Sequence, residues 1–198
     1  METRTKILNS AQRLIQTRSF EGFSFQDIAD EVGIRKASLY HHFDSKDAVA
    51  IGVLKRGADW VTGQLDATKE LAPPERLERY FDLFHDLHGK AERMCPGGSF
   101  ASVLGAVSPA VQRALHAFTK MHLDWLEGVV REGAALGAFE IGEQAPRDVA
   151  LQIFSSVQGA LLTGRLTADQ GVLDVVATEL RTYLRYTPKA REGGSKPA

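Results

Sequence analysis

The chain has 198 residues, of which 43% are hydrophobic and 25% are charged, so it can fold as one compact domain or as a small module joined to a larger one. No apolar run approaches the roughly 20 residues that a membrane helix needs, and the first ten residues carry several charges, so we expect no membrane span, no secretory signal and a cytoplasmic location. The formal net charge of -1 excludes nothing about nucleic acid, because phosphate binding depends on where cations cluster and not on their sum.

Apolar residues recur at intervals of three and four along most of the chain, which predicts an all-α fold of about nine helices. No alternating pattern persists, so no strand is expected. The first helix carries an apolar stripe made of Ile7, Leu8, Ala11, Leu14 and Ile15.

A short second helix is predicted in FSFQDIADEVG, because both of its ends are marked. Ser24 can cap its start, with Asp27 three residues later, and Phe23 and Ile28 occupy the positions of a hydrophobic staple. Gly33 ends the helix.

The segment IRKASLYHHFDSKDAV predicts a third helix with a thin buried side, from about Arg35 to His42. Leu39 and Phe43 lie four residues apart on one stripe, while the remaining side chains are mostly cationic, aromatic or hydroxyl groups. Asp44-Ser45 caps a fourth helix that continues to about Leu71 and bridges to the rest of the chain.

The remainder of the sequence predicts a larger helical body. Helices are expected from Pro74 to about residue 88, from near Pro96, from Ser108-Pro109 onward, from about 147 to 165 and from 170 to 186, with breaks at 89–95 and 137–146. We therefore divide the chain into a head (1–50), a body (51–187) and a disordered tail (188–198).

The second and third helices meet the requirements of a helix-turn-helix. Ala29 is small where the two helices touch, Gly33 can take a positive φ at the turn, and Ile34 and Leu39 hold the third helix against the second. A helix of this width fits the major groove, and its first residues would reach base edges. The pattern predicts a protein that binds double-stranded DNA.

Two flanking residues favour contacts with phosphate. Lys46 stands in the first turn of the fourth helix, where a cation opposes the helix dipole unless an anion is held there. Together with the exposed backbone N–H groups it forms a plausible phosphate clamp, and Ser24 could contribute its hydroxyl at the start of the second helix.

The stretch TKILNSAQRLIQTRSFEGFSFQDIADEVGIRKASLYHHFDSKDAV, about residues 4 to 50, resembles the DNA-binding domain of the TetR family of transcriptional regulators. Its departures include Ser19-Phe20 in place of a glycine and an aromatic, Arg35 in place of serine or threonine, and His42 in place of an aromatic. The resemblance implies a ligand-responsive repressor that binds a palindromic operator. By the same resemblance, the DNA contacts fall on Ser24, Arg35, Lys36, Ala37, Ser38, Tyr40, His41 and Lys46.

A single head contacts too few bases to be selective, so we expect a homodimer that places two recognition helices about one DNA turn apart, roughly 34 Å. The last two helices are the expected dimer surface, and QGALLTGR resembles the corresponding segment of the family weakly. The candidate dimer residues are Ile153, Val157, Ala160, Leu161, Val176 and Leu180, with ordinary core packing as the alternative.

A pocket for an unknown small-molecule inducer is expected between the helices of the body, with no cofactor. The candidate ligand-binding residues are Phe81, Phe84, His88, Cys95, Phe100, Met121 and Trp125. Aromatic side chains at helical spacing also serve as core, so these residues describe the surroundings of a cavity. The same surroundings are expected to include Trp60, His85, Phe118, His122 and Phe154.

Cys95 is the only cysteine, which excludes an intrachain disulfide. It stands just before Pro96 at a predicted helix start, where the helix dipole would lower the pKa of its thiol, and CPGGSFASVLGAV is similar to a segment of a TetR-family group in which some members sense oxidants or electrophiles. Modification of Cys95 is therefore a second possible trigger, and a buried core cysteine is the alternative.

The sequence also bears on two other functions, metal sensing and catalysis. His85 and His88 lie three apart, with Cys95 after a short break, which suits a metal-responsive regulator that binds zinc or nickel. An enzyme is not expected, because the sequence contains no phosphate-binding loop, nucleophile elbow or His-Glu-x-x-His motif.

Overall fold

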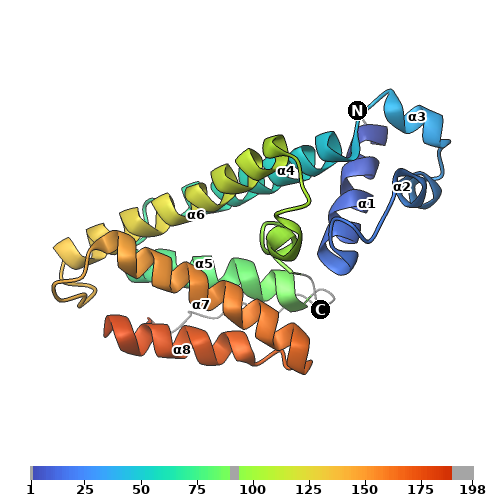
Figure 1. The fold of residues 1–198 in the computed structure, drawn as a ribbon. Coiled ribbons are helices and arrows are strands. Elements are labelled where there is room, and N and C mark those ends of the chain that lie inside the picture. The colour runs from blue at the N-terminus through green and yellow to red at the C-terminus, as the bar shows by residue number, and fades with distance from the viewer. Residues whose placement is uncertain (1, 90–93, 189–198) are drawn as a thin grey trace.

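The computed structural model describes residues 2–89 and 94–188, with side chains for the same residues except 86–89, and most of these residues lie in helices. Neither range contains a strand, which confirms the predicted all-α class. The molecule is elongated, with the first three helices gathered at one end (Figure 1). In the same ranges, no helix is long and apolar enough to cross a membrane.

The head consists of α1 (Glu2–Arg18), α2 (Phe25–Val32) and α3 (Lys36–Tyr40). The predicted capping box of α2 is confirmed, because Ser24 Oγ accepts a hydrogen bond from the Asp27 backbone N–H while the Asp27 carboxylate accepts from the Ser24 backbone N–H. Gly33 ends α2 with φ 75°, the left-handed conformation that the turn was predicted to need. The α2–α3 pair thus forms the predicted helix-turn-helix.

The fourth helix, α4 (Lys46–Asp66), is shorter than predicted. Ser45 caps its start by accepting a hydrogen bond from the Ala48 N–H. At its other end the chain leaves the helix in turns, and the Thr68 hydroxyl donates to the carbonyl of Leu65 at 2.7 Å, so a side chain satisfies one of the last carbonyl groups.

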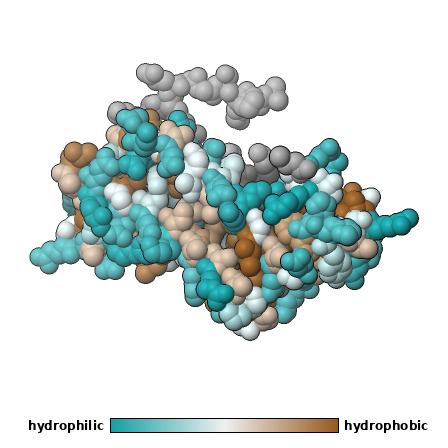
Figure 2. Space-filling model, turned by 90° about the horizontal axis from the view of Figure 1, so that it is seen from above, coloured by the Kyte–Doolittle hydropathy of each residue, from teal (hydrophilic) through white to brown (hydrophobic). Residues whose placement is uncertain are grey.

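The body contains α5 (Pro73–Gly89), α6 (Pro109–Ala135), α7 (Pro146–Thr167) and α8 (Val172–Leu184). The long helices α4 and α6 run side by side along one edge of the molecule, with α5, α7 and α8 along the other (Figure 1). Seen from above, hydrophilic residues cover most of both ends, while paler and apolar residues gather in the middle of this face (Figure 2). Apart from Pro188, the predicted tail lies outside the described residues.

The prediction of an α-helix that begins near Pro96 is wrong. The structure instead has a single short 3-10 helix in this region, η1 (Gly98–Val103). Gly97 precedes η1 and Gly98 begins it, and both glycines favour turns over helix propagation. The Phe100 N–H donates to the carbonyl of Gly97 at 3.2 Å, three residues back.

Several hydrogen bonds join α1 to the body. Arg56 on α4 donates to the Leu8 carbonyl and to the side chains of Asn9 and Gln12. Gln16 donates to the carbonyl of Met94 at 2.9 Å. Arg165 on α7 donates to the carbonyls of Gln16 and Thr17 at 3.2 and 3.0 Å, where it satisfies the carbonyl end of α1.

Candidate nucleic-acid interface and cavity

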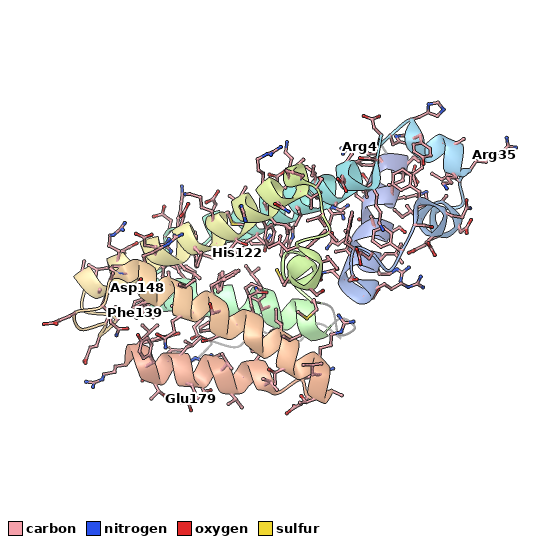
Figure 3. All side chains as sticks on the ribbon, viewed as in Figure 1. Arg4, Arg35, His122, Phe139, Asp148 and Glu179 are labelled. Carbon is pink, nitrogen blue, oxygen red and sulfur yellow. The ribbon has the colours of Figure 1, made fainter. Side chains whose placement is uncertain are left out.

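The third helix is anchored on one side and open on the other. Leu39 and Phe43 have exposed fractions of 0% and 5%, so they form the anchor that the sequence predicted. The candidate DNA-contact residues Arg35, Lys36, Ala37, Tyr40 and His41 are exposed and Ser38 is partly exposed. Figure 3 shows Arg35 pointing away from the head into solvent. The helix therefore presents cationic and hydrogen-bonding groups on one accessible surface.

Tyr40 is held in position by α2. Its ring centroid lies 5.1 Å from that of Phe25, while half of the side chain remains exposed. An aromatic ring packed on one side loses little rotamer freedom on binding, so Tyr40 is suited to a contact at the edge of the interface.

The Ser24 hydroxyl is engaged within its own cap. It donates to the Asp27 carboxylate at 2.6 Å, and this hydrogen bond is the main reason that the pKa of Asp27 lies below its usual value. Ser24 is nevertheless exposed at the start of α2, where it adjoins the N-terminal N–H groups of that helix.

The Lys46 ammonium is not free in this structure. It donates to the carbonyl of Phe23 and lies 4.6 and 4.3 Å from the ring centroids of Phe20 and Phe23. Burial lowers the pKa of Lys46. A carbonyl and two ring faces attract a cation that would otherwise face the positive end of α4, so a phosphate would have to compete for Lys46.

A cavity of about 540 Å³ lies between the head and the body. Its walls come from four helices and the segment before η1: Asn9 and Gln12 from α1, Arg56, Trp60 and Val61 from α4, Leu83 and Phe84 from α5, Phe118 and His122 from α6, and Cys95 and Pro96. The volume falls within the range of about 300–1,000 Å³ that is usual for small-molecule sites. Because α1 belongs to the head, the cavity borders both parts of the molecule.

Only some of the candidate ligand-binding residues meet at this cavity. Phe84 and Cys95 line it, whereas Phe81 lines a separate polar groove. Phe100 packs on Phe20 in the core, with ring centroids 5.4 Å apart. Trp125 stacks on Tyr80 and Met121 is partly buried against the core. The side chain of His88 lies outside the described residues.

His122 is the buried polar side chain of this cavity. Its exposed fraction is 1%, and Figure 3 shows it among the helices of the body. The rings of Phe118 and Phe154 have centroids 4.9 and 5.6 Å from that of the imidazole. Burial lowers the pKa of His122 to about 4, so the ring is neutral at pH 7.

The two nitrogens of His122 differ in their partners. Nδ1 lies 3.3 Å from the hydroxyl of Tyr80, which is itself fully buried. Nε2 is buried and, within the described residues, has no hydrogen-bond partner. A buried polar group without a partner costs free energy, so a ligand that supplies one is favoured.

Sequence reasoning placed His122 only in the wider surroundings of the pocket, and it missed Arg56 as a site residue. His122 stands four residues after Phe118 on the apolar stripe of α6, and Arg56 three residues after Val53 on the inner stripe of α4. A polar residue on an otherwise apolar stripe is the signal that could have singled out both.

The predicted lowering of the pKa of Cys95 is wrong. The thiol has an exposed fraction of 3%, and burial raises its pKa. The backbone N–H groups of Gly97 and Gly98 favour the thiolate but do not offset the burial. No α-helix begins at Pro96 to supply the expected dipole.

The structure separates two of the residues proposed to bind a metal. His85 lies 3.4 Å from a carboxylate oxygen of Asp174 and borders the polar groove, whereas Cys95 lines the cavity. Within the described ranges, no group of three or more histidine, cysteine or acidic residues could hold a metal ion.

Most of the candidate dimer residues lie on the sides of their helices that face the core of this chain, so they are not available to a second copy. Five of the six are packed inside this chain, with exposed fractions of 0% to 4%: Ile153, Val157, Ala160, Leu161 and Leu180. Val176 is partly buried. The correction follows from helix periodicity, because the strongest apolar stripe of a helix packs on its own core.

The same two helices expose a different apolar surface. Leu151, Leu162 and Leu166 on α7 and Val175 on α8 have exposed fractions of 50%, 49%, 77% and 63%. Gly159 lies on the stripe between the leucines, and an added Cβ there would meet no other atom within 4 Å. We call these five residues the α7–α8 stripe.

Comparison with known proteins matches residues 7–53 to the family model of the bacterial regulatory proteins of the tetR family. A TetR transcriptional regulator from Legionella pneumophila is 30% identical, with 90% of this chain and 95% of that chain covered and a TM-score of 0.81. A TetR-family regulator from Agrobacterium tumefaciens is 25% identical, with 94% and 98% covered and a TM-score of 0.87. The HTH-type transcriptional repressor DhaR from Mycobacterium sp. (strain GP1) is 26% identical, with 88% of each chain covered.

Proposed function

Because this chain belongs to the TetR family and is a DNA-binding transcriptional regulator, not an enzyme, we propose that it is a homodimeric repressor whose operator binding is controlled by a small molecule in the cavity. The head, residues 1–50, would bind DNA, and residues 51–187 would dimerise and hold the effector. Because its target would be operator DNA, we expect the protein to act in the cytoplasm.

The exposed surface of α3 supports the DNA-binding half of the proposal. Arg35, Lys36 and Ser38 stand at the start of the helix, where side chains reach base edges in the major groove. Tyr40 and His41 would contact the adjoining backbone, together with Ser24 and Lys46. The guanidinium of Arg35 can donate two hydrogen bonds to a guanine base or bind a phosphate.

The α7–α8 stripe supports the dimer. Exposed leucines in line with a glycine allow two copies of α7 to pack closely around a two-fold axis. Two heads in one assembly would then face successive major grooves of a palindromic operator.

The proposed control by an effector rests on the lining of the cavity, which comes from both the head and the body. Asn9 and Gln12 of α1 line it, and both accept hydrogen bonds from Arg56 of α4. A molecule that enters here changes contacts between head and body directly. It would act by favouring a conformation in which the two heads no longer fit successive grooves.

Modification of Cys95 is the less favoured trigger, because the thiol is buried and its pKa is raised. Treatment with N-ethylmaleimide should alkylate the native protein slowly and leave operator affinity unchanged over the same time. Rapid alkylation with loss of operator binding would restore Cys95 as a trigger.

The DNA-binding proposal is tested with an operator obtained by in vitro selection from random duplexes, using fluorescence anisotropy. Lys36→Ala should weaken operator binding by at least about tenfold, since a base or phosphate contact is worth roughly 1–3 kcal/mol. Lys55→Ala is the matched control, because Lys55 is an exposed lysine on α4 outside the proposed interface. Equal affinities for the two variants would contradict the assignment of α3 as the DNA-contacting helix.

A further inference from the structure

The cavity has polar groups that come from different helices. Arg56 stands on α4 and contacts α1, whereas His122 lies on α6 and contacts Tyr80 of α5. The lining also contains the aromatic side chains of Trp60, Phe84 and Phe118. A ligand that satisfies both polar groups must therefore carry two polar functions on an apolar body.

His122, which lines the cavity, has a ring nitrogen without a hydrogen-bond partner among the described residues. The Tyr80 hydroxyl is fully buried, and its only described hydrogen-bond partner is Nδ1 of His122. A buried O–H group needs an acceptor, so we assign the Tyr80 proton to this bond and the imidazole proton to Nε2. The Nε2–H group then lacks an acceptor, which a carbonyl or hydroxyl oxygen of a ligand would supply.

Arg56 offers a positive charge that has no counterion among the described residues. Its guanidinium is partly buried, and burial lowers its pKa. The hydrogen-bond partners found for it in the described part of the chain are neutral: Asn9 Oδ1 at 2.8 Å, Gln12 Oε1 at 2.7 Å and the Leu8 carbonyl at 3.0 Å. No carboxylate of the described residues forms an ion pair with Arg56.

We propose that the effector is an organic acid with an apolar, ring-containing body, whose carboxylate binds Arg56 and whose carbonyl or hydroxyl oxygen accepts a hydrogen bond from His122 Nε2. This inference rests on the proposed effector role of the cavity and names the class of molecule that fills it. The aromatic lining receives the ring, and the neutral imidazole accommodates an uncharged oxygen. The charged end of the ligand meets Arg56, the only cation among the described residues that line this cavity.

The same geometry explains how an acid would loosen the head. A hydrogen bond between a guanidinium and a carboxylate is about twice as strong as one to a neutral acceptor. A bound acid therefore draws Arg56 away from Asn9, Gln12 and the Leu8 carbonyl. The tie between α1 and α4 weakens, while the bonds of Arg165 to the end of α1 are left in place.

Calorimetric titration of the full-length protein tests the ligand class without DNA. The probes are aroyl alkanoic acids of increasing chain length, beginning with 4-oxo-4-phenylbutanoate, each paired with its methyl ester and with the aryl acid that lacks the keto group. At least one acid should bind, its ester at least tenfold more weakly and its deoxo analogue several-fold more weakly. Binding of esters as tight as that of their acids, or of no acid in the series, would overturn the proposal.

Variants assign the two ends of the ligand. Arg56→Gln should weaken binding of the acid at least tenfold and leave binding of the ester unchanged, and His122→Leu should abolish the difference between the keto acid and its deoxo analogue. Arg165→Gln is the matched control, because Arg165 also bonds to α1 but does not line the cavity. Circular dichroism and thermal unfolding without ligand show whether each variant is folded.

The two proposals fail in different ways. Failure of the ligand class would leave a protein that binds its operator and responds to some neutral or cationic compound. Failure of the effector role would leave a protein that binds the acid while its operator affinity stays the same. Equal loss of acid binding in Arg56→Gln and Arg165→Gln would instead assign the effect to the head–body junction and remove Arg56 as the ligand's partner.

Discussion

At the residue scale, two polar side chains break otherwise apolar helix stripes, His122 on α6 and Arg56 on α4. Sequence periodicity places both residues on inward-facing positions, but it cannot say whether a buried polar group has a partner. That depends on side chains from other helices, such as Tyr80 for His122 and Asn9 for Arg56. The class of effector could therefore be inferred only from the folded molecule.

Protonation of His122 should make the protein unstable in mild acid. Its folded-state pKa of about 4 lies below the ordinary value of 6.5, so the unfolded chain binds more protons between these values and stability falls as pH decreases from 6.5 towards 4. The loss attributable to His122 is up to about 2 kcal/mol between pH 6.5 and 5. Urea unfolding at several pH values measures it.

His122→Leu should flatten that pH dependence, because leucine does not titrate. The exposed His116 provides the control, and His116→Asn should retain the wild-type slope. Indistinguishable slopes for wild type and His122→Leu would show that His122 is not a buried neutral imidazole.

Lys46 should affect both folding and DNA binding. Lys46→Ala removes a hydrogen bond to the Phe23 carbonyl and the contact with two rings, which should cost about 1 kcal/mol of stability. If a phosphate displaces these contacts, the slope of log K for operator binding against log salt should decrease by about one. If the salt-dependence slope of a folded Lys46→Ala variant equals that of the wild type, Lys46 keeps its contact with Phe23 in the DNA complex and binds no phosphate.

At the element scale, helix ends were predicted correctly where the local sequence signals are strong. They were missed where contacts with other parts of the chain determine where a helix ends. The cap at Ser24, the turn at Gly33 and the start at Ser108 follow from side chains within a few residues. The end of α4 and the replacement of a helix by η1 depend on turns that propensity alone did not reveal.

Two glycines of α6 should respond oppositely to the same substitution. A Cβ at Gly133 would lie 2.1 Å from Cδ2 of Phe139, so Gly133→Ala should destabilise the protein by about 1–3 kcal/mol. At Gly128 a Cβ meets nothing within 4 Å, so Gly128→Ala should stabilise the helix by about 0.5–1 kcal/mol. Thermal unfolding compares the two, and a stabilised Gly133→Ala variant would refute the close approach of α6 to Phe139.

At the scale of the whole molecule, the sequence predicted the fold class and the helix-turn-helix. It predicted a pocket between the helices of the body, whereas the cavity also borders α1 of the head. It did not predict which side of α7 remains exposed. Ile153 and Leu162 both look like interface residues in an amphipathic pattern, but their exposed fractions are 0% and 49%. Only the packing of α7 against α6 and α8 distinguishes core from surface.

Leu162→Glu should convert the dimer to a monomer, because it places a charge in the centre of the α7–α8 stripe. Light scattering after gel filtration measures the mass, and operator affinity should fall together with dimerisation. Leu136→Glu is the matched control, since Leu136 is a 68% exposed leucine at the far end of α6. A dimeric Leu162→Glu protein would exclude the stripe as the interface.

Operator affinity measured with and without an acid bound in the cavity is the most direct test of control from the cavity. In wild-type protein saturated with the tightest-binding aroyl alkanoic acid, anisotropy should show operator binding weakened at least about tenfold, a coupling of roughly 1.4 kcal/mol. The methyl ester at the same concentration should have little effect. An acid that calorimetry shows to be bound, with operator affinity unchanged, would contradict the proposed control of DNA binding.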